Sequence, residues 1–227
     1  SIIILAYKRP DMLAQCLDSL HETLDYPAEI IINVDGDDPN RNTAFSSHGI
    51  KHDQYSKLIQ VRGNNRGVGR SFQNGLGIAE GKYIFKVDAD ILFKPQWLST
   101  AISILDKHNT VSAISLFNYN HYDPNDERFT ITQTKEDCYI VNDFVSSIYG
   151  FKKERLLISN INLIKERDQI PDDGFHTKLA LTGNLAITKE DMVTNQGFGR
   201  KSVYVSFDTD DKPFKTPTHS TPLLFGI

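Results

Sequence analysis

Apolar and polar residues alternate in blocks at the start of the chain. Ser1 to Ala6 contains four consecutive aliphatic residues, which is typical of a strand buried on both faces of a parallel sheet. Pro10 then suits the first turn of a helix, and leucines follow at spacings of four, three and four. These are Leu13, Leu17, Leu20 and Leu24. The pattern predicts a strand, a turn and an amphipathic helix.

The same alternation continues through the first half of the chain. Further strands are predicted at Glu29–Val34, Lys57–Arg62 and Lys82–Val87, with a polar loop after each. Helices are predicted over residues 68–80 and from Pro95 onward. Repeated β-α units with short crossovers predict an α/β fold with a mostly parallel central sheet flanked by helices on both faces.

From about residue 111 the pattern is less regular. Strands are expected over residues 111–116, 130–132, 139–145 and 184–188. Helices are expected from residue 152 and over residues 175–181. A strand at the first residue and an acidic, then proline-rich tail from residue 206 suggest that the chain could be one domain of a longer protein.

Composition narrows the class of protein. The 227 residues are 39% hydrophobic and 24% charged, as in ordinary globular proteins. A net charge of −4 argues against a general nucleic-acid binder, because such proteins gain affinity by neutralising phosphates. No apolar stretch approaches the roughly 20 residues of a membrane span. We therefore expect a soluble, cytoplasmic domain that binds no nucleic acid.

The chain has two cysteines, Cys16 and Cys138, which could pair in principle. Cys16 lies on the apolar face of the first predicted helix, where a free thiol acts as a small hydrophobic side chain. We expect a buried thiol there rather than a disulfide or a metal ligand.

Charged residues follow three of the predicted strands. The first strand is followed by Tyr7 and Arg9, the second by Asp35, and the fourth by Asp88 and Asp90. Ligands of open parallel sheets bind outside the carboxyl ends of the strands. Carboxylates two residues apart can face both sides of a bound group, and their oxygens suit Mg²⁺ or Mn²⁺. Aspartate also favours turns, so the acidic tripeptide Asp88-Ala89-Asp90 could be only a loop.

The segment NNRGVGRSFQNGLG, residues 64–77, separates the third and fourth strands. Gly75 and Gly77 fall within the predicted helix, where each costs ~1 kcal/mol relative to alanine. The expected reason is that the helix backbone closely approaches another part of the protein at these glycines. Arg66 and Arg70 could reach a diphosphate held near Asp90, because guanidinium groups match phosphate geometry. A solvated basic face is the alternative.

The order of these motifs resembles the family 2 glycosyltransferases, nucleotide-sugar enzymes of the GT-A fold. The resemblance rests on SIIILAYKRP, INVDGDD, NNRGVGRSFQNGLGIAEGKYIFKVDADIL and PDDGFHTKLALTG. It covers the first hundred residues well and the remainder in patches. It implies one GT-A domain over residues 1–227, in which residues 1–110 bind the sugar donor and residues 111–227 bind the acceptor.

The resemblance also implies roles for individual residues at the donor site. The base and ribose of the nucleotide would be held by Ala6, Tyr7, Arg9 and Asp35. The glycine-containing segment would line the donor site through Asn65, Arg66, Gly67 and Arg70. Ribose and a Mn²⁺ or Mg²⁺ ion would be held by Asp88 and Asp90.

On the acceptor side, the family places an acidic pair before a helix, and its second member acts as the base. Asp172 and Asp173 match this pair, which implies that Asp173 is the catalytic base. An acceptor hydroxyl must lose a proton as it attacks, and a second carboxylate nearby raises the pKa of the base. Asp172 could instead cap the helix. His176 and His219 are weaker candidates for a further metal ligand.

We therefore expect a metal-dependent, inverting glycosyltransferase that uses a nucleoside diphosphate sugar, most simply a UDP-sugar. The acceptor would be a hydroxyl of a glycan, a glycoprotein or a small molecule. The alternatives are a retaining glycosyltransferase, a sugar nucleotidyltransferase and a non-catalytic module that binds nucleotide-sugars or glycans. A nucleotidyltransferase usually carries a glycine-rich loop after the first strand, and residues 7–10 lack one.

Overall fold

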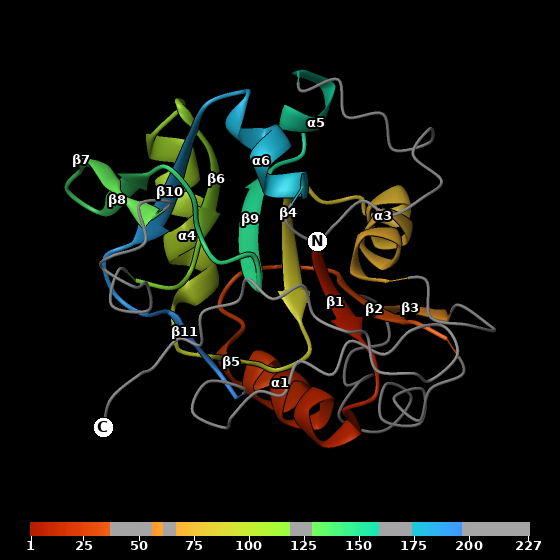
Figure 1. Cartoon of the computed structure of the whole chain (residues 1–227). Coiled ribbons are helices and arrows are strands. Elements are labelled where there is room, and N and C mark those ends of the chain that lie inside the picture. Colours follow the sequence, from red (N-terminus) through yellow and green to blue (C-terminus); the bar gives the residue numbers. More distant parts are fainter. Residues whose placement is uncertain (37–55, 61–66, 119–128, 159–173, 197–227) are drawn as a thin grey trace, which may run out of the picture.

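The computed structural model describes residues 1–36, 56–60, 67–118, 129–158 and 174–196 (Figure 1). The helices of this part are α1 (Pro10–Thr23), α3 (Val68–Ile78), α4 (Trp97–Lys107), α5 (Arg155–Ile158) and α6 (Gly174–Ala180). None of these described helices has the length and apolar character that crossing a membrane requires.

The described strands form a nine-stranded sheet and a separate two-stranded sheet. The large sheet has the order β3-β2-β1-β4-β9-β6-β10-β8-β7, and the small one pairs β11 with β5. The strands are β1 (Ile2–Ala6), β2 (Ile30–Val34), β3 (Ser56–Gln60), β4 (Tyr83–Asp88), β5 (Ile91–Phe93), β6 (Val111–Ser115), β7 (Ile131–Thr134), β8 (Cys138–Val141), β9 (Ile148–Lys152), β10 (Asn184–Thr188) and β11 (Val193–Asn195).

The large sheet is mixed. β3, β2, β1 and β4 are parallel neighbours, as expected from the β-α alternation of the first half. β9 is antiparallel to both β4 and β6, and β8 is antiparallel to β10 and β7. Residues 135–137 connect β7 to β8, and this turn is too short for the crossover that parallel strands require. The α/β prediction is confirmed, but the parallel pairing is confined mainly to the first half.

Most predicted elements match the structure to within a few residues, and the larger differences in their bounds lie in the second half. The strand expected over residues 139–145 ends at Val141, and the helix expected from residue 152 begins at Arg155 because β9 occupies Ile148–Lys152. The short strands β5 and β11 were not predicted. The division into a donor half and an acceptor half stays a prediction.

Helices cover both faces of the large sheet, as predicted. Along β1, Ile2, Ile4 and Ala6 belong to the core cluster that contains α1 and α4 residues, while Ile3 and Leu5 belong to the cluster with α3 and α6 residues. Successive strand side chains point to opposite faces. This explains the unbroken aliphatic run at the start of the sequence. Each fully buried Leu or Ile side chain stabilises the fold by about 1.5–3 kcal/mol.

Both cysteines are buried free thiols, so the prediction for Cys16 is confirmed. Burial raises the pKa of both thiols, and the pKa of Cys138 rises to about 11. Both side chains therefore remain protonated and serve as part of the core.

The two helical glycines of α3 differ in their surroundings. A Cβ atom at Gly75 would overlap Cγ2 of Ile3, so this glycine allows α3 to pack closely on β1. A Cβ atom at Gly77 would meet nothing within 4 Å. The expectation of a close approach is therefore right for Gly75 and wrong for Gly77.

This difference predicts opposite effects of the same substitution in one helix. Gly75→Ala should lower the free energy of unfolding by about 1–3 kcal/mol, because Ile3 and α3 must move apart. Gly77→Ala should raise the free energy of unfolding by about 0.5–1 kcal/mol, because alanine is the better helix former. Urea denaturation of both variants measures the two changes. Equal changes in both variants would show that α3 does not pack on β1 at Gly75.

Candidate functional site

The ends of β1, β2 and β4 form one edge of the large sheet. In the parallel register Ala6 pairs with Val34, and Leu5 pairs with Asp88. The backbone N–H of Asp35 donates to the carbonyl of Ala6 over 3.1 Å. The structure therefore brings together three residues that the sequence analysis placed at the donor site, Ala6, Asp35 and Asp88.

Asp35 fixes the start of α3 at this edge. Its side chain is buried, and its Oδ2 accepts a hydrogen bond of 2.8 Å from the backbone N–H of Gly67. Gly67 has φ +84°, a left-handed conformation that glycine adopts without strain, and α3 begins at the next residue. Asn33, also buried, donates from Nδ2 to the carbonyl of Ser71 over 2.5 Å. These two bonds hold the first turns of α3 against β2.

Asp88, at the end of β4, contacts a lysine that the sequence analysis did not consider. The Lys86 Nζ lies 2.6 Å from Oδ1 of Asp88 and donates to the carbonyl of Ser146 over 2.8 Å. The Lys86 side chain has no exposed surface, whereas that of Asp88 is 28% exposed. The signal in the sequence was a lysine that interrupts the apolar residues of the strand YIFKVD.

Asp90 lies just after β4 and pairs with Arg9, which follows β1. Arg9 Nη1 is 3.2 Å from Oδ2 of Asp90, and Asn195 Nδ2 donates to Oδ1 over 3.3 Å. Burial raises the pKa of Asp90, and the charge of Arg9 opposes this rise. Arg9 was predicted to contact the nucleotide directly, but in this structure its described partner is the second carboxylate of the acidic tripeptide.

Two further predicted residues, Tyr7 and Arg70, lie within the described part of the chain. Tyr7 follows β1 directly, and Arg70 lies in the first turn of α3. The remaining predicted residues lie outside the described part of the chain: Asn65, Arg66, Asp172, Asp173 and His219. Their roles stay predictions.

His176 lies in α6, which begins at Gly174, directly after the predicted base. The His176 side chain is buried, and its Nε2 lies 2.8 Å from Oδ1 of Asp143. Its ring stacks on Phe144 with centroids 5.0 Å apart. These contacts tie α6 to the segment before β9 and give Nε2 of His176 a structural partner.

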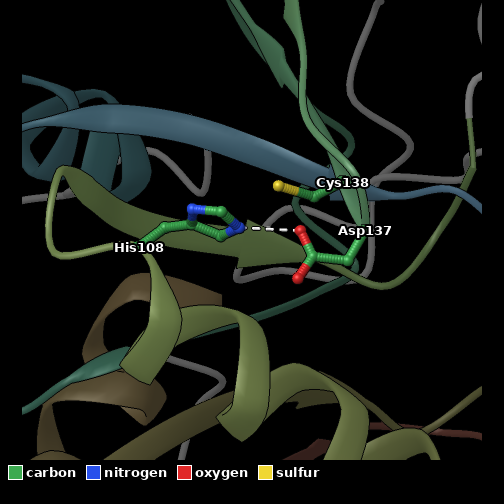
Figure 2. Close-up of side chains that lie close together, drawn as sticks. All are labelled: His108, Asp137 and Cys138. Carbon is green, nitrogen blue, oxygen red and sulfur yellow. Dashed lines mark hydrogen bonds and ion pairs between the residues drawn. The ribbon is translucent and has the colours of Figure 1, made fainter.

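Another group of possible metal ligands lies elsewhere in the described structure. Figure 2 shows His108, Asp137 and Cys138, whose ligand atoms all lie within 4.8 Å of one another. His108 Nε2 is 2.7 Å from Oδ1 of Asp137, and Lys107 Nζ is 3.1 Å from Oδ2. Each oxygen of Asp137 thus already has a partner, and the Cys138 thiol is protonated. The group joins the end of α4 to the turn before β8. Neither of these elements carries a residue predicted to bind the donor.

Sequence comparisons point to one family. The family model described as Glycosyl transferase family 2 matches residues 1–164. An uncharacterized glycosyltransferase of Haemophilus influenzae is 27% identical over 119 residues, which are 52% of this chain and 36% of that protein. Glycosyltransferase GlyG of Streptococcus pneumoniae is 22% identical over 173 residues, 73% of this chain and 56% of GlyG. The chain thus spans only part of the length of these relatives.

Solved structures share the fold. S. aureus TarS 1–349 has a TM-score of 0.64 at 20% identity, with 85% of this chain and 58% of that chain covered. The mannosyltransferase PcManGT from Pyrobaculum calidifontis, in complex with GDP-Man and Mn²⁺, has a TM-score of 0.61 at 22% identity, covering 84% and 54%. GalNAc-T7 with UDP, GalNAc and Mn²⁺ has a TM-score of 0.67 at 13% identity, covering 86% and 42%.

The bond between Asp35 and Gly67 predicts a contrast between two substitutions. Asp35→Ala removes the acceptor of a part-buried N–H and should lower the free energy of unfolding by about 1–3 kcal/mol. Asp35→Asn keeps an acceptor oxygen of the same size, so it should cost less than about 1 kcal/mol. Urea denaturation measures both. A loss from Asp35→Asn as large as that from Asp35→Ala would mean that charge, and not this hydrogen bond, holds α3.

Proposed function

Because the chain belongs to glycosyltransferase family 2 and has the GT-A fold, we propose that it transfers a sugar from a nucleoside diphosphate donor to an acceptor hydroxyl. The observation that carries the proposal is the convergence of Asp35, Asp88 and Asp90 at the carboxyl edge of β1, β2 and β4. Proteins of similar structure have been solved in complex with UDP, UDP-GlcNAc, GDP-Man and Mn²⁺, which supports this class of donor.

The nucleoside would be held by Asp35 and Asp88, whose carboxylate oxygens accept hydrogen bonds from base N–H groups and ribose hydroxyls. Ala6 ends β1 and Tyr7 follows it at the same edge, and both would border the base. Gly67 and Arg70 begin α3, next to Asp35, and would line the donor site together with Asn65 and Arg66. Arg70 would supply positive charge for the diphosphate.

The residues of this edge fit a Mn²⁺ or Mg²⁺ ion. Burial makes the charge of Asp90 costly, and Arg9 offsets this cost only in part, since the pKa of Asp90 remains raised. A divalent cation would favour the charged carboxylate, and its oxygens are the ligands that hard cations prefer. Asp90, with Asp88 beside it, would hold the ion. When bound, the ion supplies Lewis-acid neutralisation of the leaving diphosphate.

In the transfer step, the acceptor oxygen forms a bond to the anomeric carbon while the bond from that carbon to the diphosphate breaks. The hydroxyl proton passes to the Asp173 carboxylate. The base and the leaving group would lie on opposite sides of the sugar, so the reaction inverts the anomeric configuration. The place of Asp173 directly before α6 supports this role, because His176 and Asp143 fix that helix.

We also propose that UDP is the preferred nucleotide and that the protein is cytoplasmic. The acceptor would be a hydroxyl of a glycan, a glycoprotein or a small molecule.

Two substitutions separate donor binding from chemistry. Asp90→Asn should weaken binding of UDP or GDP in the presence of Mn²⁺ by about tenfold or more, because a charged metal ligand is lost. Asp173→Asn should leave that affinity nearly unchanged and slow the transfer by about 10²–10⁴-fold, because the general base is lost. Calorimetry measures the affinity, and release of UDP or GDP measures turnover.

Asp106→Asn serves as a control for these variants, because Asp106 lies on α4 and contacts Tyr83 and Lys152 rather than the donor edge. It should change neither quantity. Undiminished Mn²⁺-dependent nucleotide binding by Asp90→Asn would contradict the proposed metal site. Full turnover by Asp173→Asn would contradict the proposed base.

A further inference from the structure

Lys86 is a buried cation inside a strand of the central sheet. It lies in the middle of β4, and its side chain is completely buried. Lysine is almost never fully buried unless it is paired, because removing an ammonium group from water is costly. An apolar side chain of similar length would fill the same space without that cost. The distinctive contribution of Lys86 is therefore its charge and its N–H donors.

The N–H groups of Lys86 are directed at the carboxyl edge of the sheet. Residues two apart on a strand share a face, so Lys86 and Asp88 project from the same side of β4. The ammonium lies 2.6 Å from Oδ1 of Asp88, and it also donates to the carbonyl of Ser146 over 2.8 Å. The pairing thus joins the candidate nucleoside-binding carboxylate to the segment that precedes β9.

That segment is held at further points around Asp88. The carbonyl of Ser147 accepts a 2.9 Å hydrogen bond from the backbone N–H of Asp88. The carbonyl of Val145 accepts a 3.3 Å bond from Oγ of Ser115 in β6. Lys86 therefore binds both the Asp88 side chain and the loop beside it, while β4 and β9 fix the backbone between them.

We propose that Lys86 is a positioning residue for the sugar donor: its ammonium group fixes the orientation of the Asp88 carboxylate toward the nucleoside. The proposal rests on the proposed function, because that function assigns Asp88 to the nucleoside. Lys86 itself is buried behind Asp88 and acts on the donor only through it.

A double-mutant cycle on nucleotide affinity tests this role. Lys86→Met keeps the length of the side chain without its charge, and Asp88→Asn keeps the shape of the carboxylate. Each should weaken binding of UDP or GDP with Mn²⁺ by about tenfold, as measured by calorimetry. In the Asp88→Asn background, adding Lys86→Met should weaken binding less than about twofold further, since a positioning residue has no effect without the group it positions.

Lys153→Met is the matched control. Its Nζ also donates to a backbone carbonyl, that of Ala79, but Lys153 follows β9 at the end opposite Asp88. This variant should keep wild-type nucleotide affinity even where it lowers stability. Lys86→Gln, which keeps an N–H donor and loses the charge, is measured in parallel and provides the same cycle where Lys86→Met does not fold.

The unfolding midpoint in urea gives a readout that needs no ligand. Asp88→Asn alone leaves a buried ammonium without its carboxylate, so the double variant should unfold at a higher urea concentration than Asp88→Asn. A lower midpoint for the double variant would contradict the ion pair. Losses of nucleotide affinity that multiply in the double variant would overturn the positioning role. Wild-type protein that binds no nucleoside diphosphate would instead overturn the proposed function, and this inference with it.

Discussion

The parallel register of β1, β2 and β4 is the constraint on which the candidate site depends. Because these strands end at one edge, three segments far apart in the sequence deliver polar side chains to the same place: Ala6 to Arg9, Asp35, and Asp88 to Asp90. The aliphatic residues of β1 are buried on both faces, so a shift of register would expose core residues. The hydrophobic core and the site are therefore specified by the same pairing.

Asp88 and Asp90 each have a positively charged partner at this edge. Lys86 contacts Asp88 from within the sheet, and Arg9 contacts Asp90 from the end of β1. The two pairs differ in exposure, because the Lys86 side chain is completely buried whereas that of Arg9 is 51% exposed. The first pair is suited to hold a carboxylate in a fixed orientation. The second would be able to rearrange around the proposed diphosphate and cation, since an exposed ion pair contributes little to stability.

Much of the fold and part of this site could be predicted from the sequence. Uninterrupted apolar strands followed by aspartates indicate a parallel sheet and polar residues at its carboxyl edge, and Asp35 and Asp88 do lie at that edge. The contact between Arg9 and Asp90 could not be predicted, because it depends on which strands are neighbours. The antiparallel β9 and the three-residue strands β5 and β11 depend likewise on distant partners. The only sign of Lys86 in the sequence was a charged residue at a strand position where an apolar residue is expected.

The proposed function places the sugar donor at the carboxyl edge of β1, β2 and β4. A crystal structure of the protein with Mn²⁺ and a nucleoside diphosphate tests it most directly. We expect the nucleoside to lie against Asp35 and Asp88, with the ion and the diphosphate beside Asp90. A nucleotide bound at another surface, with this edge free of ligand, would contradict the proposed donor site.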